Sequence, residues 1–482
     1  MGTVRRTLVT ALAVTALAVP LGLASAAGTA AAATPVPPRV PATDFNHDGY
    51  GDLVLGAPGA TVSGKETAGA VSVVYGGKNG PDIANSKVFT RSTTGIPGAA
   101  EEGGYFGERV TSGDLDGDSY TDLVVAGLGG APSVVLWGSA AGLSGQGSVA
   151  LPTSTGMFAV GDFNGDGHRD LVTDDYPRSD DPDSDNSDDA GMTISYGPFD
   201  RASGKPASQD SIVTSQTFGP ADIVVGDMTG DGADDIVTSH GFEEMAYAGK
   251  FWKGGKDGVS HTAKSLTSSF RGAVGDVDGD GYGDLVVHDI GDNYEDIPYE
   301  KGTVLVMYGT AGGPSTTRTK TITQDTAGVP GVGESGDMFG TDISAGDVNG
   351  DGFADIAVGV PGEAIGDIKD AGSVVLLKGG RGGLSGTGSQ AFNQSTTAVP
   401  GASETGDGFG QQVVLSDLNG DGKADLTAAA PLEDGTYTDS GAAWVLRGAT
   451  GGLTTSGITS FGAAAVRVPE KNAQLGQDLG AR

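Results

Sequence analysis

One acidic pattern of nine residues occurs seven times in this 482-residue chain and constrains the fold more than any other feature. The pattern reads Asp-x-(Asp/Asn)-x-Asp-x-x-x-Asp, and threonine replaces the third residue in one copy. The copies start 48 to 71 residues apart, at Asp44, Asp114, Asp162, Asp227, Asp276, Asp347 and Asp417. Such regular recurrence predicts an array in which each repeat is one supersecondary unit.

Short apolar runs surround each acidic loop. A Phe-Gly pair precedes the loop in four copies, at Phe106, Phe218, Phe339 and Phe409. The loop is followed by a run such as 53–59 (LVLGAPG), then by a second run such as 70–75 (AVSVVY). A glycine-rich turn such as 138–145 (GSAAGLSG) leads to a fourth apolar stretch. Each repeat therefore predicts four antiparallel strands joined as a meander.

Four-stranded antiparallel units that repeat radially form a β-propeller. The sequence thus predicts an all-β fold, a seven-bladed propeller over residues 44–482. Leu475-Gly476 stands where Phe-Gly belongs, and the acidic loop that should follow it is the one at Asp44. We expect residues 473–482 to supply the first strand of the blade whose other three strands follow Asp44, because this pairing closes the ring and removes an open sheet edge.

Phe-Gly, the acidic loop and Gly56-Ala57-Pro58 together resemble the FG-GAP repeats of the integrin α-subunit propeller. Repeats three to five depart from this pattern, with Thr-Asp-Asp at 173–175, Thr-Ser-His at 238–240 and Val-His-Asp at 287–289. The resemblance implies an extracellular, adhesion-type module that binds a protein or a polysaccharide. Similar repeats also accompany phospholipases and polysaccharide-cleaving domains, so the alternative is a secreted hydrolase or lyase built on the propeller.

The acidic loops offer ligands that suit calcium, which takes six to eight oxygen donors at flexible geometry. Side chains at positions one, three, five and nine and the backbone carbonyl at position seven would form each cage, for up to seven Ca²⁺ ions. The predicted metal ligands are Asp44, Asn46, Asp48, Tyr50, Asp52, Asp114, Asp116, Asp118, Tyr120, Asp122, Asp162, Asn164, Asp166, His168, Asp170, Asp227, Thr229, Asp231, Ala233, Asp235, Asp276, Asp278, Asp280, Tyr282, Asp284, Asp347, Asn349, Asp351, Phe353, Asp355, Asp417, Asn419, Asp421, Lys423 and Asp425.

An EF-hand is the competing interpretation of these loops, because its loop also begins with alternating acidic residues. Its twelfth position requires a bidentate glutamate. The residues found there are Leu55, Val125, Thr173, Thr238, Val287, Val358 and Ala428, and none of them supplies a carboxylate. Asx-rich turns without metal are the other alternative, and they explain one copy better than seven.

The N-terminus has the features of a secretion signal. Arg5 and Arg6 precede an apolar run over 8–23 and a small-residue motif at 24–26. We expect a signal peptide over residues 1–33, with cleavage between about 26 and 33, and a proline-rich linker over 34–43. Arg5 and Arg6 also allow the alternative interpretation that the protein is exported through the twin-arginine route. No second spanning run follows, so the sequence predicts a secreted, extracellular or surface-associated protein without a membrane span.

Charge and motifs limit the partners. With 28 basic and 62 acidic residues the formal charge is −34, which disfavours nucleic acid and anionic membranes. The five histidines lie in no H-E-x-x-H motif and no G-x-S-x-G motif is near them, so binding is favoured over catalysis. In a meander, the acidic loops share one face, termed the bottom. The opposite face, termed the top, carries the long loops at 174–190, 289–302, 362–372 and 432–441 and is the expected surface for the unknown protein or polysaccharide.

Overall fold

The computed structural model describes residues 1–2, 43–128, 131–151, 156–175, 190–214, 219–242, 245–291, 295 and 297–480. The predicted signal peptide, the predicted linker up to residue 42, Phe218 and most of the loop at 174–190 lie outside the described residues. The sheets of the described chain all lie in one compact unit, Pro38–Arg482.

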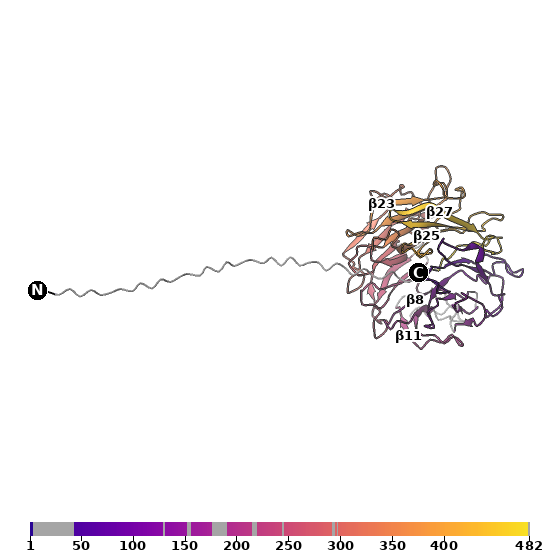
Figure 1. Ribbon diagram of the computed structural model, residues 1–482, viewed down its shortest axis with the longest axis horizontal. Coiled ribbons are helices and arrows are strands. Elements are labelled where there is room, and N and C mark those ends of the chain that lie inside the picture. The colour runs from indigo at the N-terminus through magenta and orange to yellow at the C-terminus, as the bar shows by residue number, and fades with distance from the viewer. Residues whose placement is uncertain are drawn as a thin grey trace. The chain divides into compact units, whose positions relative to one another are not determined.

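The described chain forms seven antiparallel sheets, each a meander that is one blade of a β-propeller (Figure 1). Blades are numbered by their acidic loops. Blades 1 to 3 comprise β1 (Leu53–Ala57), β2 (Ala70–Val74) and β3 (Lys87–Phe89); β4 (Val110–Gly113), β5 (Asp122–Val125), β6 (Val134–Leu136) and β7 (Val149–Ala150); and β8 (Phe158–Gly161), β9 (Asp170–Asp175), β10 (Gly191–Tyr196) and β11 (Ser208–Val213).

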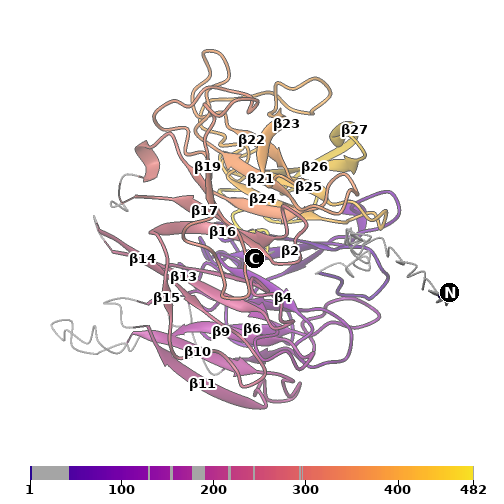
Figure 2. The same cartoon turned by 90° about the vertical axis from the view of Figure 1, so that its left-hand side faces the viewer.

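Blades 4 to 7 each contain four strands, and Figure 2 shows several of these sheets side by side. They comprise β12 (Asp222–Gly226), β13 (Asp235–Phe242), β14 (Met245–Trp252) and β15 (Lys264–Ser265); β16 (Ser269–Gly275), β17 (Asp284–Asp289), β18 (Val304–Met307) and β19 (Thr319–Ile322); β20 (Ile343–Gly346), β21 (Asp355–Val360), β22 (Ser373–Lys378) and β23 (Ser385–Phe392); and β24 (Gln412–Ser416), β25 (Asp425–Ala430), β26 (Ala442–Ala449) and β27 (Gly452–Gly462). In the described segments, short 3-10 helices at Ile83–Asn85 and Ile297–Tyr299 lie between strands.

Neighbouring blades pack face to face, and this packing explains the continuous apolar runs. All six residues of β21 are buried, because both faces of the strand contact a neighbouring sheet. The hydrophobic core divides into seven clusters, and each one joins two successive blades. The last cluster joins blade 7 to blade 1, since it contains Val414 and Ala429 together with Leu53 and Leu55. The seven-bladed fold predicted from the repeats is confirmed.

The two ends of the described propeller meet in blade 1. The N–H of Gly476 donates to the carbonyl of Gly56 at 2.8 Å, and the N–H of Gly56 donates to the carbonyl of Asp478 at 2.8 Å. These two bonds repeat the ones before β20, where Gly340 donates to Gly359 at 3.0 Å and Gly359 donates to Asp342 at 2.9 Å. The C-terminal segment therefore takes the position of the first strand. Residues 473–480 form turns rather than a regular strand, because the pairing is limited to these two bonds.

The acidic loops are joined to one another along the bottom face. In six places the N–H of position eight donates to the position-one carbonyl of the preceding loop, at 2.7 to 3.1 Å. The donor and acceptor pairs are Gly51 and Asp417, Thr121 and Asp44, Asp234 and Asp162, Gly283 and Asp227, Ala354 and Asp276, and Ala424 and Asp347. These bonds include the junction between blades 7 and 1, so they help to close the ring.

Candidate metal centre

The position-one aspartate organises each acidic loop by accepting backbone hydrogen bonds. In all seven loops its two oxygens accept the N–H groups of positions five and six, at 2.8 to 3.3 Å. Position six has a positive φ throughout, which glycine adopts without strain; Ser119 is the exception, at φ 74°. The loop thus folds around a carboxylate before any ion is considered.

The position-five aspartate also accepts a backbone hydrogen bond within its own loop. Its Oδ1 accepts the N–H of position seven in every loop, at 2.9 to 3.2 Å. These short-range bonds are Asx turns, in which an Asp or Asn side chain accepts a backbone N–H two residues on. The alternation of acidic residues in the sequence is therefore explained by local structure as well as by metal chemistry.

The position-nine aspartate, at the start of the second strand, is at most 4 % exposed in every loop. One oxygen accepts the N–H of a glycine at the end of the third strand or just after it, at 2.8 to 3.0 Å, in all seven blades. In blades 1 to 5 the other oxygen accepts the N–H of loop position two, at 2.8 to 2.9 Å. This carboxylate therefore ties the acidic loop to the end of the third strand.

Burial raises the pKa of the position-nine carboxyls, because desolvation disfavours their charged form more than the backbone N–H bonds favour it. The pKa is about 8 for Asp122, about 7 for Asp52, Asp235 and Asp284, and about 6 for Asp170, Asp355 and Asp425. Neighbouring loop carboxylates raise each value further. A bound cation would oppose both effects.

In loops 2 and 5 three carboxylates converge. One oxygen from each of Asp114, Asp116 and Asp122 lies within 4.8 Å of the others, and the same holds for Asp276, Asp278 and Asp284. These are positions one, three and nine of the two loops in which position three is an aspartate. All-oxygen donors at this spacing fit a hard divalent cation. The structure thus brings together two clusters that could hold such an ion.

The other five loops have an amide or a hydroxyl at position three. Asn46 and Asn164 donate to the position-five carboxylates Asp48 and Asp166, each at 2.9 Å. Asn349 and Asn419 instead donate to the position-nine carboxylates Asp355 and Asp425, at 3.1 and 3.0 Å. The residues of these loops, including Thr229 and the position-seven carbonyls, remain predicted ligands.

Two arginines that the repeat pattern does not indicate contact the converging clusters. Arg201 forms ion pairs with Asp116, at 3.0 Å, and with Asp118. Arg318 forms ion pairs with Asp278 and, at 3.1 Å, with Asp280. Each guanidinium also lies over an aromatic ring at the end of a third strand, Trp137 for Arg201 and Tyr308 for Arg318.

The two arginines occupy different places in the chain. Arg201 follows β10 of blade 3 and reaches the loop of blade 2, whereas Arg318 precedes β19 of blade 5 and reaches the loop of its own blade. No sequence signal could have revealed this correspondence, since it depends on how the turns fold over the loops.

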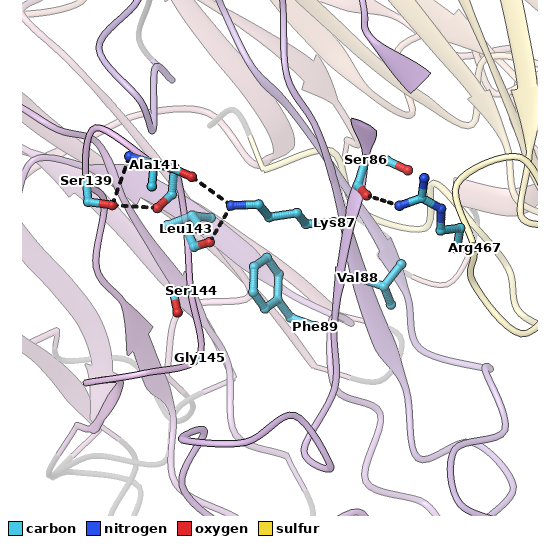
Figure 3. Close-up of a pocket in the computed structure, with 11 residues that line it drawn as sticks. Ser86, Lys87, Val88, Phe89, Ser139, Ala141, Leu143, Ser144, Gly145 and Arg467 are labelled. Atoms are coloured by element: carbon cyan, nitrogen blue, oxygen red, sulfur yellow. Dashed lines mark hydrogen bonds between the residues drawn. The ribbon is translucent and has the colours of Figure 1, made fainter. Parts of the chain in front are cut away.

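A pocket of about 540 Å³ lies between β3 and the turn at 139–145 of blade 2 (Figure 3). Lys87 extends across it and donates to the carbonyls of Ala141 and Leu143, at 2.8 and 2.9 Å, and Arg467 donates to the carbonyl of Ser86 at 3.0 Å. Both cations are thus engaged by backbone carbonyls at a junction between blades. The pocket contains none of the predicted metal ligands.

One buried histidine lies on the top side of blade 5. His288 is 0 % exposed, and its Nε2 is 3.9 Å from a carboxylate oxygen of Glu300. Burial lowers the pKa of His288 to about 4. In the sequence, His288 stands out only as part of a changed Gly-Ala-Pro motif.

Family models match four segments of the chain. The FG-GAP repeat model matches residues 37–74, 339–377 and 409–446, and the FG-GAP-like repeat model matches residues 114–173. The chain therefore contains FG-GAP repeats within a seven-bladed β-propeller. The resemblance stated from the sequence is confirmed.

Curated relatives share only a segment of this chain. Phosphatidylinositol-glycan-specific phospholipase D of Bos taurus is 35 % identical over 149 residues, which are 27 % of this chain and 17 % of that protein. Integrin alpha-V of Gallus gallus is 38 % identical over 124 residues, 25 % of this chain and 10 % of that protein. The chain therefore spans less than a fifth of the length of either relative.

Among solved structures, rhamnogalacturonan lyase YesW aligns with 82 % of this chain and 73 % of its own, at 10 % identity and a TM-score of 0.26. A likeness at this score carries no argument about fold or function. In the part of the chain that the structure describes, no helix is long and apolar enough to cross a membrane.

Proposed function

We propose that this protein is a secreted, calcium-stabilised β-propeller that binds an extracellular protein or polysaccharide through its top face. The proposal that the protein binds calcium rests on two clusters of converging carboxylates. These are Asp114, Asp116 and Asp122, and Asp276, Asp278 and Asp284. Carboxylates held this close repel one another, and a divalent cation between them relieves the repulsion.

Calcium is favoured over magnesium because each loop offers several carboxylate and other oxygen donors. Magnesium requires a tight octahedron and keeps several waters, whereas calcium accepts irregular cages. The clusters in loops 2 and 5 are the first candidates, and the shared pattern extends the proposal to up to seven ions. Because the loops are connected along the bottom face, ions bound there would stabilise the junctions between blades.

The experiment is thermal unfolding of the purified propeller in millimolar Ca²⁺, in Mg²⁺ and in excess EGTA. With extracellular-type affinities of about 0.1 to 1 mM, each filled site contributes up to about 1.4 kcal/mol. We expect calcium to raise the Tm by several degrees and magnesium to have little effect. The variant D276N/D278N should lose part of the increase, and an equal Tm in calcium and EGTA would refute the calcium proposal.

The binding role is supported by the fold, since propellers commonly recognise ligands at a loop face. The name of one relative is that of a phospholipase, but this chain covers 17 % of that protein, so its activity is not carried over. A glycan array and a pull-down with extracellular proteins test binding. Turnover of phosphoinositide-glycan lipids or pectic polysaccharides by the purified protein would favour the enzyme alternative instead.

A further inference from the structure

Two sets of polar residues on the top face are copies of each other. Set A contains Gln324, Asp337 and Glu363, and set B contains Gln394, Asp407 and Glu433, each 70 positions after its counterpart. Set A lies where blade 5 meets blade 6, and set B where blade 6 meets blade 7. Neither set belongs to the acidic loops of the bottom face.

The contacts of the two sets agree in detail. Nε2 of Gln324 donates to Glu363 at 2.6 Å, and Nε2 of Gln394 donates to Glu433 at 2.7 Å. Asp337 accepts the N–H of Glu334 at 2.5 Å, and Asp407 accepts the N–H of Glu404 at 2.7 Å. The two glutamines and the two aspartates are each 3 % exposed, while Glu363 and Glu433 are half-buried.

Each glutamine has a buried oxygen without a partner among the described residues. Oε1 of Gln324 and Oε1 of Gln394 accept no hydrogen bond. A buried carbonyl oxygen that is left unpaired is destabilising, because nothing compensates for the loss of its bonds to water. Because the nitrogen of the same amide donates to the glutamate, this oxygen lies close to the glutamate carboxylate. The same unpaired oxygen occurs in both sets, which indicates that the two sets bind the same kind of ligand.

Among the described residues, no ion pair is formed by the carboxylates of either set. In set B the carboxyl groups of Asp407 and Glu433 interact directly, and Glu404 and Asp434 add further negative charge near Glu433. In set A the basic group near Asp337 is Lys301, which lies 3.7 Å from the exposed Asp325. Two carboxyls in contact require a proton or a cation between them.

The junction of blades 1 and 2 is the natural comparison. Arg91 takes the place of the glutamine there, and Gly104 takes the place of the aspartate. Arg91 packs against Gly98 as Gln324 packs against Gly331 and Gln394 against Gly401. Its guanidinium donates to the carbonyls of Pro97 and Pro132 at 2.7 and 2.5 Å. At this junction a guanidinium paired with backbone carbonyls takes the position of the glutamine amide, and no aspartate of the described chain faces it.

We propose that sets A and B each bind a divalent cation with a preference for oxygen ligands, such as Ca²⁺, on the top face. The glutamine Oε1, the glutamate carboxylate and the aspartate carboxylate supply the protein ligands, and water completes the coordination. This site is separate from the acidic loops and does not depend on their occupancy.

The test counts ions by native mass spectrometry of the purified propeller in Ca²⁺, and locates them in crystals grown with Tb³⁺ by anomalous scattering. We expect E363Q and E433Q each to remove one ion, or to raise its Kd about 10-fold to 100-fold, and the double variant to remove two. The control is E101Q, which changes an exposed glutamate at the junction of blades 1 and 2 and should leave the count unchanged.

A second variant guards against loss of the fold. Q394R/D407G copies the first junction into set B, so it should keep the wild-type Tm and still lose one ion. Equal ion counts in wild type and E363Q/E433Q would overturn the proposal, as would no anomalous peak within bonding distance of Gln394 Oε1. The D276N/D278N variant distinguishes the two ideas, because it should lose ions from the bottom face while both top-face ions remain.

Discussion

The backbone N–H of Gly476 donates a 2.8 Å hydrogen bond to the carbonyl of Gly56, which lies 420 positions earlier in the chain. This bond joins the C-terminal segment to β1, and it has the same register as the pairing that starts blade 6. Leu475, beside it, is 0 % exposed and packs in the core cluster between blades 7 and 1. Closure of the ring therefore combines backbone pairing with burial of apolar side chains.

The first prediction concerns this closure. L475A should lower the free energy of unfolding by about 3 kcal/mol, because it removes a fully buried leucine side chain and leaves a cavity. Chemical denaturation measures the change. K471A, at an exposed position of the same segment, is the control and should have an effect below about 0.5 kcal/mol. Equal stability of the two variants would show that the C-terminal segment does not close the ring.

The second prediction concerns the position-nine carboxylate. D52N should destabilise the metal-free protein by about 1 to 3 kcal/mol, since both oxygens of Asp52 accept backbone N–H groups, from Phe45 and Gly76, and an amide can accept at only one. Unfolding in EGTA measures this effect without metal. D48N keeps the Oδ1 acceptor of its exposed loop, so it should be nearly neutral. A neutral D52N would show that Asp52 serves metal binding alone.

The third prediction concerns Arg318. R318Q should increase the calcium affinity of loop 5 by about tenfold, or about 1.4 kcal/mol, because Asp278 and Asp280 no longer have to release a guanidinium before binding the ion. Isothermal titration calorimetry compares this variant with wild type and with R381Q at an exposed position. A fall in affinity would mean that Arg318 supports the binding geometry rather than competing with the ion.

The fourth prediction concerns pH. Burial lowers the pKa of His288 to about 4, so the unfolded chain binds a proton that the folded protein does not bind. His288 should therefore reduce stability by about 3 kcal/mol as the pH falls from 6.5 to 4. The position-nine aspartates contribute with the opposite sign, because their folded pKa is raised and their destabilising effect disappears as the pH falls below about 6.

The difference between wild type and H288L isolates the histidine. In EGTA the variant should lose less stability, or gain more, than wild type between pH 6.5 and pH 4. H261L, which changes an exposed histidine paired with Asp210, is the control and should follow wild type closely. If the free energy of unfolding changed with pH equally in H288L and wild type, His288 would not be the cause of the loss of stability at low pH.

Much of the fold could be predicted because its signals are local. The apolar runs and glycine-rich turns of each repeat specify a meander, and seven copies specify the number of blades. The place of Leu475-Gly476 predicted the closure with blade 1, which Gly56 confirms. The acidic loop was visible as a pattern because its bonds connect residues two to five positions apart, as those from Asp44 to Asp48 and Gly49 do.

The sequence by itself determined the repeats, the strands and the loops, since each depends on neighbouring residues of one segment. Only the tertiary structure decided which loops gather three carboxylates, that Arg201 crosses from blade 3 to Asp116 of blade 2, and that Gln394 meets Glu433. These contacts depend on the packing of one sheet against the next. The distance and the angle between two neighbouring sheets decide which side chains meet across a blade junction. The spacing of residues within a single repeat does not encode them.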